Sequence, residues 1–320
     1  MRILRTTICA LFAALLCVAA RAAEQTDVKA VLVTGASSGI GRKITEHLAA
    51  DGYLVYATAR KEEDLKALGT IKNVQPIRLD VTQPADIAAA VDAVTKAGRG
   101  LYGLVNNAGV ATFGTLDKMR MEEFDLTMKV NVYGPVMMIK AFMPLIVAAK
   151  GRIVNIGSPS GITDGGGPDI AAYVMSKHAI EGLTDSLVLQ LGPLGVQVSA
   201  VEPGAYRSDM DKNMLARLTE DEKANMLKVW GVPDPMMFPE PDEVAAAVGQ
   251  ALSEPNPKRR YLAIPRNSKD RINARLPERL MRYQMKKLVQ WNEGHAYTFD
   301  RDTLVKMLDE ALVHARPRTE

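Results

Sequence analysis

Short apolar runs alternate with longer stretches of helical periodicity between residues 28 and 264. The apolar runs predict seven strands, over Ala30–Thr34, Leu54–Ala59, Val74–Asp80, Gly103–Asn106, Arg152–Gly157, Val196–Glu202 and Tyr261–Ile264. The stretches between them predict helices over Arg42–Ala50, Lys61–Leu68, Ala85–Ala97, Met119–Ala149, Ala171–Leu191 and Asp242–Leu252. Because the strand runs show no clean period of two, we expect the strands to be buried on both faces.

Strict alternation of strand and helix predicts an α/β fold with a doubly wound parallel sheet and right-handed crossovers. The catalytic domain is expected over residues 28–265, followed by a helical extension over residues 266–320. Ligands of such sheets bind where the strands end, at their carboxyl side. Side chains just after the strands are therefore the first candidates for a site.

Residues 205–241 interrupt the alternation with an insertion that is rich in methionine and punctuated by four prolines. An apolar, adaptable segment beside a ligand site is typical of a mobile lid over a substrate. An ordinary packed helical insertion is the alternative.

The extension is basic, with 15 Lys and Arg against 8 Asp and Glu from Lys258 to the end of the chain. Ile272, Leu276, Leu280 and Tyr283 fall on one face of a predicted helix, with arginines around them. Such a face suits an anionic membrane surface. The alternative is a helix packed on the body of the protein with a solvated basic face.

Residues Met1–Ala23 have the parts of a secretory signal: a start with Arg2 and Arg5, an uncharged run Ile8–Ala20, and a small-x-small ending. That run is short for a membrane span, which needs about 20 residues. A cleaved signal, an uncleaved anchor and a wrongly assigned start codon all remain open. A signal points to export or the periplasm.

The remainder of the chain is electrically balanced, since Arg2, Arg5 and Arg21 account for the whole excess of 40 basic over 37 acidic residues. A neutral body argues against general nucleic-acid binding. Both cysteines lie in the leader, so the body has no disulfide and no thiolate metal site. The four histidines (His47, His178, His295 and His314) show no metal-binding spacing, so no metal is expected.

Candidate chemistry begins with Gly35, Gly39 and Gly41, which have the spacing GxxxGxG between a predicted strand and a predicted helix. Glycines allow close backbone approach, and the helix N-terminus offers unpaired N–H groups to a pyrophosphate. The motif predicts a dinucleotide site, with a bare structural turn as the alternative.

The second strand ends without a carboxylate, and Arg60 follows it. An acidic residue at this point would bind a ribose 2′-hydroxyl, whereas a guanidinium suits a 2′-phosphate. The sequence therefore favours NADP(H); a solvated Arg60 with mixed use of NAD(H) is the alternative. Asp80 ends the third strand, where an adenine edge could bind. Asn106 and Asn107 end the fourth, where their amides could line the cofactor or tie strands together.

Tyr173 and Lys177 lie one helical turn apart and so share a face. A free tyrosine, with a pKa of about 10, is a poor base at neutral pH, and lowering it by about 3 units requires roughly 4 kcal/mol. The Lys177 ammonium and an oxidised nicotinamide can supply that stabilisation. A chance surface pair is the alternative for this motif taken alone.

Together, TGASSGIG, NNAG, Asn131, Ser158, the YxxxK motif at 173–177 and Pro203-Gly204 resemble the short-chain dehydrogenase/reductase family, in its single-domain branch of about 250 residues. The resemblance covers about Val28 to Ile264 and implies a Rossmann-type sheet. It also implies a homo-oligomer, dimer or tetramer.

The resemblance assigns roles residue by residue. Tyr173 matches the acid/base, Lys177 the lysine that binds the nicotinamide ribose, Ser158 the serine that hydrogen-bonds the substrate oxygen, and Asn131 the asparagine of the proton-relay path. The implied cofactor-binding residues are Gly35, Ser37, Ser38, Gly39, Ile40, Gly41, Arg60, Asp80, Val81, Asn107, Ala108, Gly109, Tyr173, Lys177, Pro203, Gly204 and Ser208.

The chain also departs from the family pattern. The interval from Ser158 to Tyr173 is about two positions longer than usual, so that Ser160 has the commoner spacing. Gly157 replaces the first of two usual serines, and Ser208 replaces a threonine after Pro-Gly.

The expected function is an NADP(H)-preferring oxidoreductase that interconverts a primary or secondary alcohol and its carbonyl compound. The methionine-rich insertion favours a lipophilic substrate of steroid, retinoid or fatty type. A non-catalytic NADP-binding or interaction protein on the same fold is the rival. Use of NADP(H) favours the cytoplasmic side, in tension with the leader, which an uncleaved anchor would resolve.

Overall fold

The computed structural model describes residues 28–163, 169–230, 238–265, 280, 282–287 and 300–315. Two compact units divide the chain, one ending at Ala274 and one beginning at Arg275. The predicted leader lies outside the described residues, as do residues 231–237 of the insertion and most of the extension.

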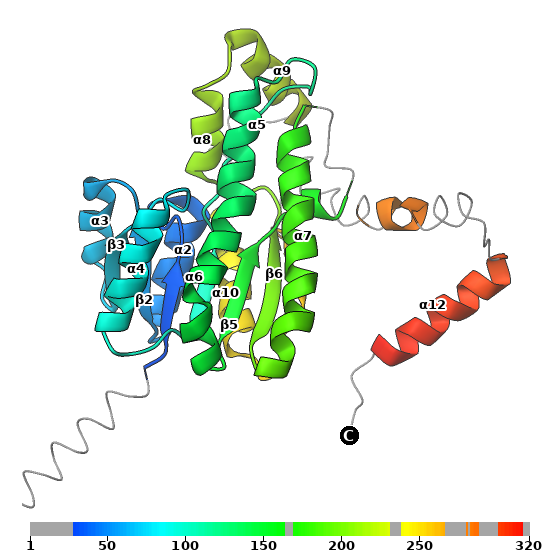
Figure 1. Ribbon diagram of the computed structural model, residues 1–320. Helices are drawn as coiled ribbons and strands as arrows, with labels where there is room; N and C mark the ends of the chain where they lie inside the picture. Colours follow the sequence, from blue (N-terminus) through cyan, green and yellow to red (C-terminus); the bar gives the residue numbers. More distant parts are fainter. Residues whose placement is uncertain are drawn as a thin grey trace, which may run out of the picture. The chain divides into compact units, whose positions relative to one another are not determined.

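Seven parallel strands form one sheet with the order β3-β2-β1-β4-β5-β6-β7 (Figure 1). Their bounds are β1 Ala30–Val33, β2 Leu54–Ala59, β3 Val74–Arg78, β4 Gly103–Asn106, β5 Arg152–Ile156, β6 Gln197–Pro203 and β7 Arg260–Ala263. Each predicted strand is present, and the doubly wound parallel α/β fold is confirmed. The strand order reverses between β1 and β4, which is where such sheets bind ligands.

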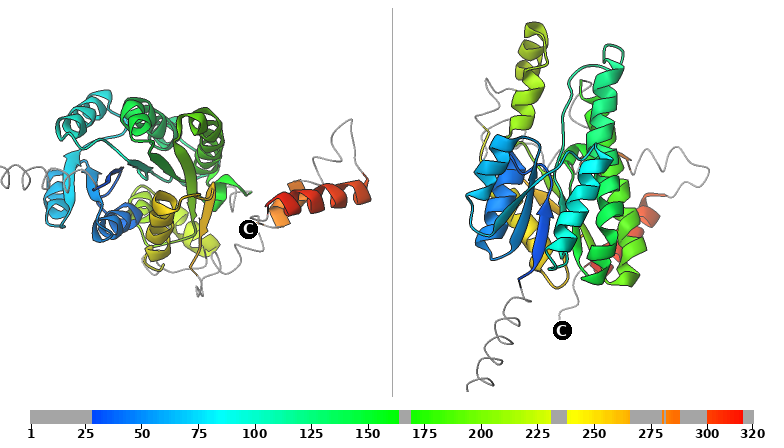
Figure 2. Two further views of the ribbon diagram at one scale, coloured as in Figure 1. Left: turned by 90° about the horizontal axis from the view of Figure 1, so that it is seen from below. Right: turned by 60° about the vertical axis from the view of Figure 1, so that its left-hand side comes forward.

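Helices cover both faces of the sheet, as the left-hand view of Figure 2 shows. Their bounds are α2 Gly39–Ala50, α3 Glu62–Gly69, α4 Pro84–Lys96, α5 Met121–Met128, α6 Gly134–Ala148, α7 Ala171–Leu191 and α10 Asp242–Ser253. On one face α2 and α10 bury Ile44, Leu48 and Val248 against Val31 and Val55 of the sheet. Alternate strand residues point to the other face, where they pack against α4, α6 and α7. This two-sided burial explains why the strand runs lack a period of two.

The helix predicted over Met119–Ala149 contains a π-helical turn, η1 (Lys129–Tyr133), between α5 and α6. The run Met121–Ala148 is the one described helix long and apolar enough to cross a membrane. However, Met138, Phe142 and Ile146 of α6 are fully buried in the core of the sheet. Core packing therefore accounts for the apolar character of this run.

The insertion, for which the sequence left open a mobile lid or a packed helical segment, contains two helices, α8 (Asp209–Leu215) and α9 (Glu220–Trp230). In Figure 1 they lie beyond the end of the sheet from which α7 begins. In the second unit, α12 spans Arg301–Ala315. Of the predicted apolar face of the extension, Leu280 and Tyr283 are described, and Ile272 and Leu276 lie outside the described residues.

Candidate active site

The glycine loop between β1 and α2 is shaped by close backbone contacts. Gly35 and Gly39 have φ of 65° and 52°, a region that favours glycine. A Cβ on Gly35 would lie 2.9 Å from Ala108 Cα, and one on Gly41 would collide with the carbonyl oxygen of Gly35. The N-cap of α2, Ser38, makes no side-chain capping bond. The glycines thus let the loop pack closely against its neighbours, and the first turn of α2 has no side-chain cap from Ser38. The N–H groups of a helix N-terminus suit a pyrophosphate.

Two neighbouring asparagines at the end of β4 make different hydrogen bonds, one between strands and one to the glycine loop. Asn106 Nδ2 donates to Asn155 Oδ1 at 2.9 Å and ties β4 to β5. Asn107 Nδ2 donates to the carbonyl oxygens of Thr34 (2.8 Å) and Gly35 (3.0 Å) and braces the glycine loop. Ala108 and Gly109 follow at the same edge. Asn107 therefore holds the backbone of the glycine loop at the candidate cofactor site.

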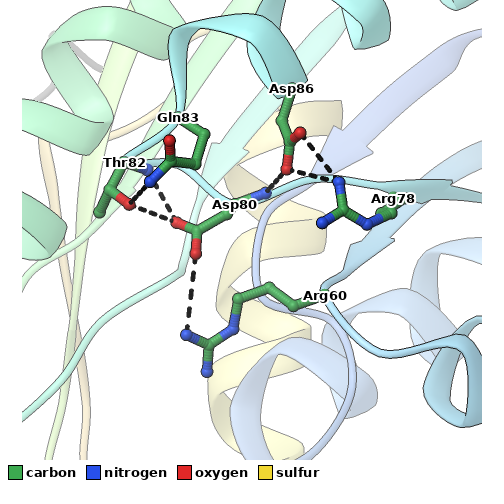
Figure 3. Close-up of polar contacts among 6 residues, drawn as sticks. All are labelled: Arg60, Arg78, Asp80, Thr82, Gln83 and Asp86. Atoms are coloured by element: carbon green, nitrogen blue, oxygen red, sulfur yellow. Dashed lines mark hydrogen bonds and ion pairs between the residues drawn. The ribbon is translucent and has the colours of Figure 1, made fainter.

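Arg60 and Asp80 meet at the outer end of this edge, as Figure 3 shows. Arg60 Nη1 lies 3.9 Å from Asp80 Oδ2, and the Arg60 side chain is 71% exposed. Asp80 Oδ1 accepts from Thr82 at both its backbone N–H (2.9 Å) and its hydroxyl (2.7 Å), which fixes the carboxylate. Val81 packs toward Gly134, whose added Cβ would lie 2.9 Å from Val81 Cγ2. Arg60 is thus loosely paired and open to solvent.

Tyr173, Ser158 and Lys177 come together at the start of α7, after β5. The Tyr173 and Ser158 side chains share a hydrogen bond. Lys177 is buried, donates from Nζ to the carbonyl oxygen of Ile156 at 2.9 Å, and lies 5.5 Å from the centre of the Tyr173 ring. Ser158 Oγ also accepts from the Ser160 N–H at 3.1 Å. Ser158, the candidate that the strand pattern selected, is therefore the serine bonded to Tyr173.

The charges at this site are strongly affected by burial. Burial raises the pKa of Tyr173 to about 12, against the opposing hydrogen bond from Ser158 and with a smaller contribution from the Asp211 carboxylate. Burial lowers the pKa of Lys177 to about 8, and the nearby Glu181 carboxylate opposes this. In the protein alone, desolvation of the phenol outweighs the hydrogen bond from Ser158. The lowered tyrosine pKa expected from the sequence includes the charge of an oxidised nicotinamide, so it stays a prediction for the protein with its cofactor.

Asn131 lies in the π-helical turn η1 and is buried. Its Oδ1 accepts from the Val110 N–H at 2.8 Å, and its Nδ2 donates to the Val110 carbonyl (2.9 Å) and to Ser176 Oγ (3.0 Å). Ser176 in turn donates to the carbonyl oxygen of Tyr173 at 2.7 Å. This chain of hydrogen bonds joins the fourth strand's loop to the catalytic helix.

The insertion contributes an apolar cluster beside Tyr173. Met214 and Ala111 form its buried centre, and the partly buried members around them are Phe113, Tyr173, Met210, Leu215 and Leu218. Ser208, the N-cap of α8, lies against the glycine loop, since a Cβ on Gly39 would be 3.1 Å from Ser208 Cα. Pro203 ends β6, and Gly204 follows with its N–H bonded to Ala263. Of the predicted cofactor residues after β6, Ser208 thus borders the glycine loop, and Gly204 is bonded to β7.

Sequence reasoning missed several charged groups. Asp211 is buried on α8, accepts from Ser208 Oγ at 3.0 Å, and has its pKa raised to about 6 by burial. Glu181 is buried one turn after Lys177. Helical spacing gave a signal for both, because each lies three or four residues from a predicted site residue. The spacing did not predict that the Asp211 and Glu181 side chains are buried.

A model of the short chain dehydrogenase family matches residues 29–219, more than half of the chain. The protein is a member of this family. A relative in Mus musculus, mitochondrial D-beta-hydroxybutyrate dehydrogenase, is 36% identical over 194 residues, covering 58% of this chain and 56% of the relative. Retinol dehydrogenase 5 of Mus musculus is 38% identical over 186 residues, covering 56% of this chain and 57% of the relative. The match thus spans under three fifths of either relative's length.

A similar solved structure is the actinorhodin polyketide ketoreductase with NADPH. It is 28% identical, superposes with a TM-score of 0.63, and the match covers 74% of this chain and 95% of that one.

Proposed function

We propose that this protein is a nicotinamide-dependent oxidoreductase that interconverts an alcohol and its carbonyl compound, with Tyr173 as the acid/base. The observation that carries the proposal is the meeting of three groups at one edge of the sheet. These are the Tyr173 phenol bonded to Ser158, the buried Lys177 ammonium, and the glycine loop. Relatives named as dehydrogenases of hydroxybutyrate and retinol support the same class of reaction.

The side chains have separate tasks. A bound nicotinamide supplies hydride to the carbonyl carbon, or accepts it in the reverse direction. Tyr173 gives its phenolic proton to the oxygen that becomes the alcohol hydroxyl, and takes it back during oxidation. Ser158 donates a hydrogen bond to that oxygen and orients it. Lys177 stabilises the phenolate by its positive charge and would hold the ribose hydroxyls.

The cofactor is proposed to be NADP(H). Arg60 follows β2 directly, its guanidinium is largely exposed, and its pairing with Asp80 is long at 3.9 Å. A 2′-phosphate would meet the Arg60 guanidinium there, and a charge-assisted pair with a guanidinium is among the stronger polar contacts. The ketoreductase solved with NADPH is a supporting case.

The substrate is proposed to be uncharged and lipophilic. Met210, Met214 and Phe113 surround Tyr173 with apolar surface. Asp211 adds a buried carboxylate whose charge is felt by Tyr173. Burial raises the pKa of Asp211 to about 6. In its ionised form this carboxylate would repel the carboxylate of a hydroxy acid. The site therefore favours alcohols of the retinol kind over hydroxybutyrate.

The test measures loss of NADPH absorbance by the full-length protein with a panel of ketones and aldehydes of increasing chain length. Tyr173→Phe is the matched control, because it removes the hydroxyl and little volume. We expect turnover with apolar carbonyl compounds and a loss of more than about a hundredfold in kcat in the variant, with NADPH binding retained. Absence of wild-type turnover with either cofactor in both directions would refute the proposal.

A further inference from the structure

The insertion between β6 and α10 is tied together where it begins and ends. The Arg207 N–H donates to the carbonyl oxygen of Pro239 at 2.9 Å, and the Arg207 guanidinium is paired with Glu240. Tyr206 and Phe238, which flank this pairing, are both buried. These contacts hold the two ends of the insertion side by side. Contacts at the base of a segment do not by themselves fix where its far part lies.

A second attachment lies between α8 and α9, in the turn that carries Arg217. Arg217 Nη2 donates to the carbonyl oxygen of Ala111 at 2.6 Å. Arg217 Nε lies 3.4 Å from Glu123 Oε2 on α5. The guanidinium therefore bonds to the loop after β4 through one nitrogen and pairs with α5 through another. Arginine is suited to such two-point contacts because its donors are held in one rigid plane.

Both partners of this guanidinium are themselves held in place. The Glu123 side chain is 19% exposed, and its Oε1 accepts from Arg120 Nη2 at 3.0 Å. Ala111 is buried, and its neighbour Val110 exchanges two hydrogen bonds with the Asn131 amide, at 2.8 and 2.9 Å. The second attachment is thus made to fixed groups of the protein body, one of them in the loop that Asn131 braces.

The turn between α8 and α9 is also held by local hydrogen bonds. The Leu218 N–H donates to the carbonyl oxygen of Leu215 at 3.1 Å. At the start of α9 the Thr219 N–H donates to Glu222 Oε2 at 2.8 Å, and the Glu222 N–H donates to Thr219 Oγ1 at 3.3 Å. This reciprocal pair is a capping box, which fixes the entry of the chain into the helix. The backbone that carries the guanidinium is therefore ordered on both sides.

The apolar side chains beside Tyr173 lie close to this attachment in the sequence. Met210 and Met214 of α8 and Leu218 after it belong to the same cluster as Tyr173, and these three side chains form the apolar wall of the insertion. The Arg217 N–H donates to the carbonyl oxygen of Met214 at 3.0 Å. A contact that holds the Arg217 side chain on the protein body therefore also holds the apolar wall at the site.

We propose that Arg217 is a positioning and specificity-determining residue. It fastens the insertion to the loop after β4 and to α5, and so keeps the apolar wall beside Tyr173. This role rests on the proposed function, in which the wall contacts the chain of a lipophilic substrate. Arg217 acts through the insertion and not on the reacting oxygen. Its removal should therefore weaken the binding of long apolar substrates more than it slows the reaction.

The first test needs no substrate. Arg217→Met keeps most of the side-chain length and removes both contacts, and hydrogen–deuterium exchange of the full-length protein measures how often α8 opens. The amides of residues 210–218 should exchange at least about tenfold faster in this variant, because a hydrogen bond from a charged group to a backbone carbonyl changes a local equilibrium by about that factor or more.

Glu123→Gln is a milder variant that applies if Arg217→Met does not fold. It keeps the shape of the side chain, removes the charge from the ion pair and leaves the bond to Ala111. The amides of residues 210–218 should exchange about threefold faster, because the pair is only partly shielded from solvent. An exchange rate equal to that of the wild type, in whichever of the two variants folds, overturns the proposal.

Arg120→Met and Lys223→Met are the matched controls. Arg120 pairs with the carboxylate that Arg217 also contacts, but it is the N-cap of α5 and lies outside the insertion. Lys223 lies in the insertion and pairs with Glu220 of the same helix at 2.6 Å. Neither pair joins the insertion to the body, so both variants should leave the exchange of residues 210–218 unchanged. Equal acceleration by either control overturns the role of Arg217.

The second test separates a positioning role from a merely structural one. For the longest carbonyl compound that the wild type reduces, Arg217→Met should raise KM about tenfold and change kcat by less than about twofold. For the shortest compound, which does not reach the apolar wall, KM should change by less than about twofold, and so should the affinity for NADPH. An equal loss with short and long substrates, or a loss confined to kcat, overturns the proposal.

The two tests also separate this proposal from the proposed function. If the wild type reduces no carbonyl compound with either cofactor, the proposed function fails, and the exchange rates alone decide whether Arg217 fastens the insertion. If the wild type is active and Arg217→Met exchanges no faster, the proposed function stands and the role of Arg217 is overturned.

Discussion

Two cations of the site, Lys177 and Arg60, lie at the same edge of the sheet in opposite surroundings. Lys177 is 7% exposed and has a fixed acceptor at 2.9 Å, whereas the Arg60 side chain is 71% exposed and its nearest carboxylate is 3.9 Å away. A buried charge interacts strongly with its neighbours, and an exposed one is weakened by water and salt. The buried Lys177 is thus suited to assisting the reaction, and the exposed Arg60 to distinguishing between two cofactors that differ by one phosphate.

The largest effect should follow removal of the buried cation. Lys177→Met preserves most of the volume and should reduce kcat/KM by about a thousandfold, in the range for loss of assistance to an acid/base group. The melting temperature should not fall, because an incompletely paired buried ammonium is replaced by an apolar chain. Steady-state kinetics and thermal unfolding check both statements. A fall in kcat/KM of less than tenfold would contradict the assignment of the reaction to Lys177 and of cofactor choice to Arg60.

Removing the exposed cation should change selectivity rather than rate. Arg60→Ala should weaken the binding of NADPH by about 10- to 100-fold, which corresponds to the loss of a charge-assisted hydrogen bond of about 1.5–3 kcal/mol. The binding of NADH should weaken by less than about twofold. The difference should shrink in high salt. Binding is measured by titration of nucleotide fluorescence.

The control for Arg60 lies on the neighbouring strand. Arg78 is bonded by Nη1 to both oxygens of Asp86, at 2.9 and 3.0 Å (Figure 3). Arg78→Ala should therefore alter the affinity of neither cofactor. Equal weakening of both by Arg60→Ala, or a wild-type preference for NADH, would contradict the assignment.

The burial of Glu202 on β6 leads to a prediction about the stability of the fold. The pKa of Glu202 is raised from an ordinary 4.5 to about 8 by burial, so the folded state binds this proton more tightly than the unfolded chain. Its contribution to stability is full below about pH 4.5 and is lost as the pH rises through 8. Glu202→Gln cannot ionise and should be more stable than wild type by about 1–3 kcal/mol at pH 9. Denaturant unfolding at pH 5 and pH 9 measures this, and a constant difference would contradict it.

The smallest effect concerns the apolar cluster beside Tyr173. If Met214 and its neighbours contact the substrate chain, kcat/KM should rise by up to about fourfold per added CH₂, equal to about 0.8 kcal/mol. Met214→Asn should flatten that rise while leaving NADPH affinity unchanged. A flat wild-type profile would mean that the substrate chain lies elsewhere.

Much of the molecule follows from local patterns. The bounds of every strand were predicted to within two residues, because burial on both faces leaves an apolar run that turns interrupt. Gly35, Gly39, Gly41, Tyr173 and Lys177 were found because their chemistry demands a fixed spacing along one element. These features depend on neighbours in sequence.

The remainder depends on neighbours in space. Glu181 has the sequence of an exposed helical residue, and only the absence of a side chain at Gly157 and the arrival of Arg260 from β7 bury it. Asp211 belongs to α8, a helix of only seven residues in the insertion, and its burial comes from the packing of that helix on the protein. The motif shows the cation beside Tyr173 but not the desolvation that raises the pKa of this tyrosine in the protein alone.

The π-helical turn at Lys129–Tyr133 means that the helices before and after it are out of phase. One extra residue rotates everything that follows by roughly 100° relative to a regular helix. Asn131 can then turn its amide to Val110 and Ser176 while Met138 and Phe142 still face the sheet. In a regular helix, either the Asn131 hydrogen bonds or the packing of Met138 and Phe142 on the sheet would be lost. Deleting a single residue here should therefore turn the Asn131 amide away from Val110 and Ser176 while α6 keeps its packing on the sheet.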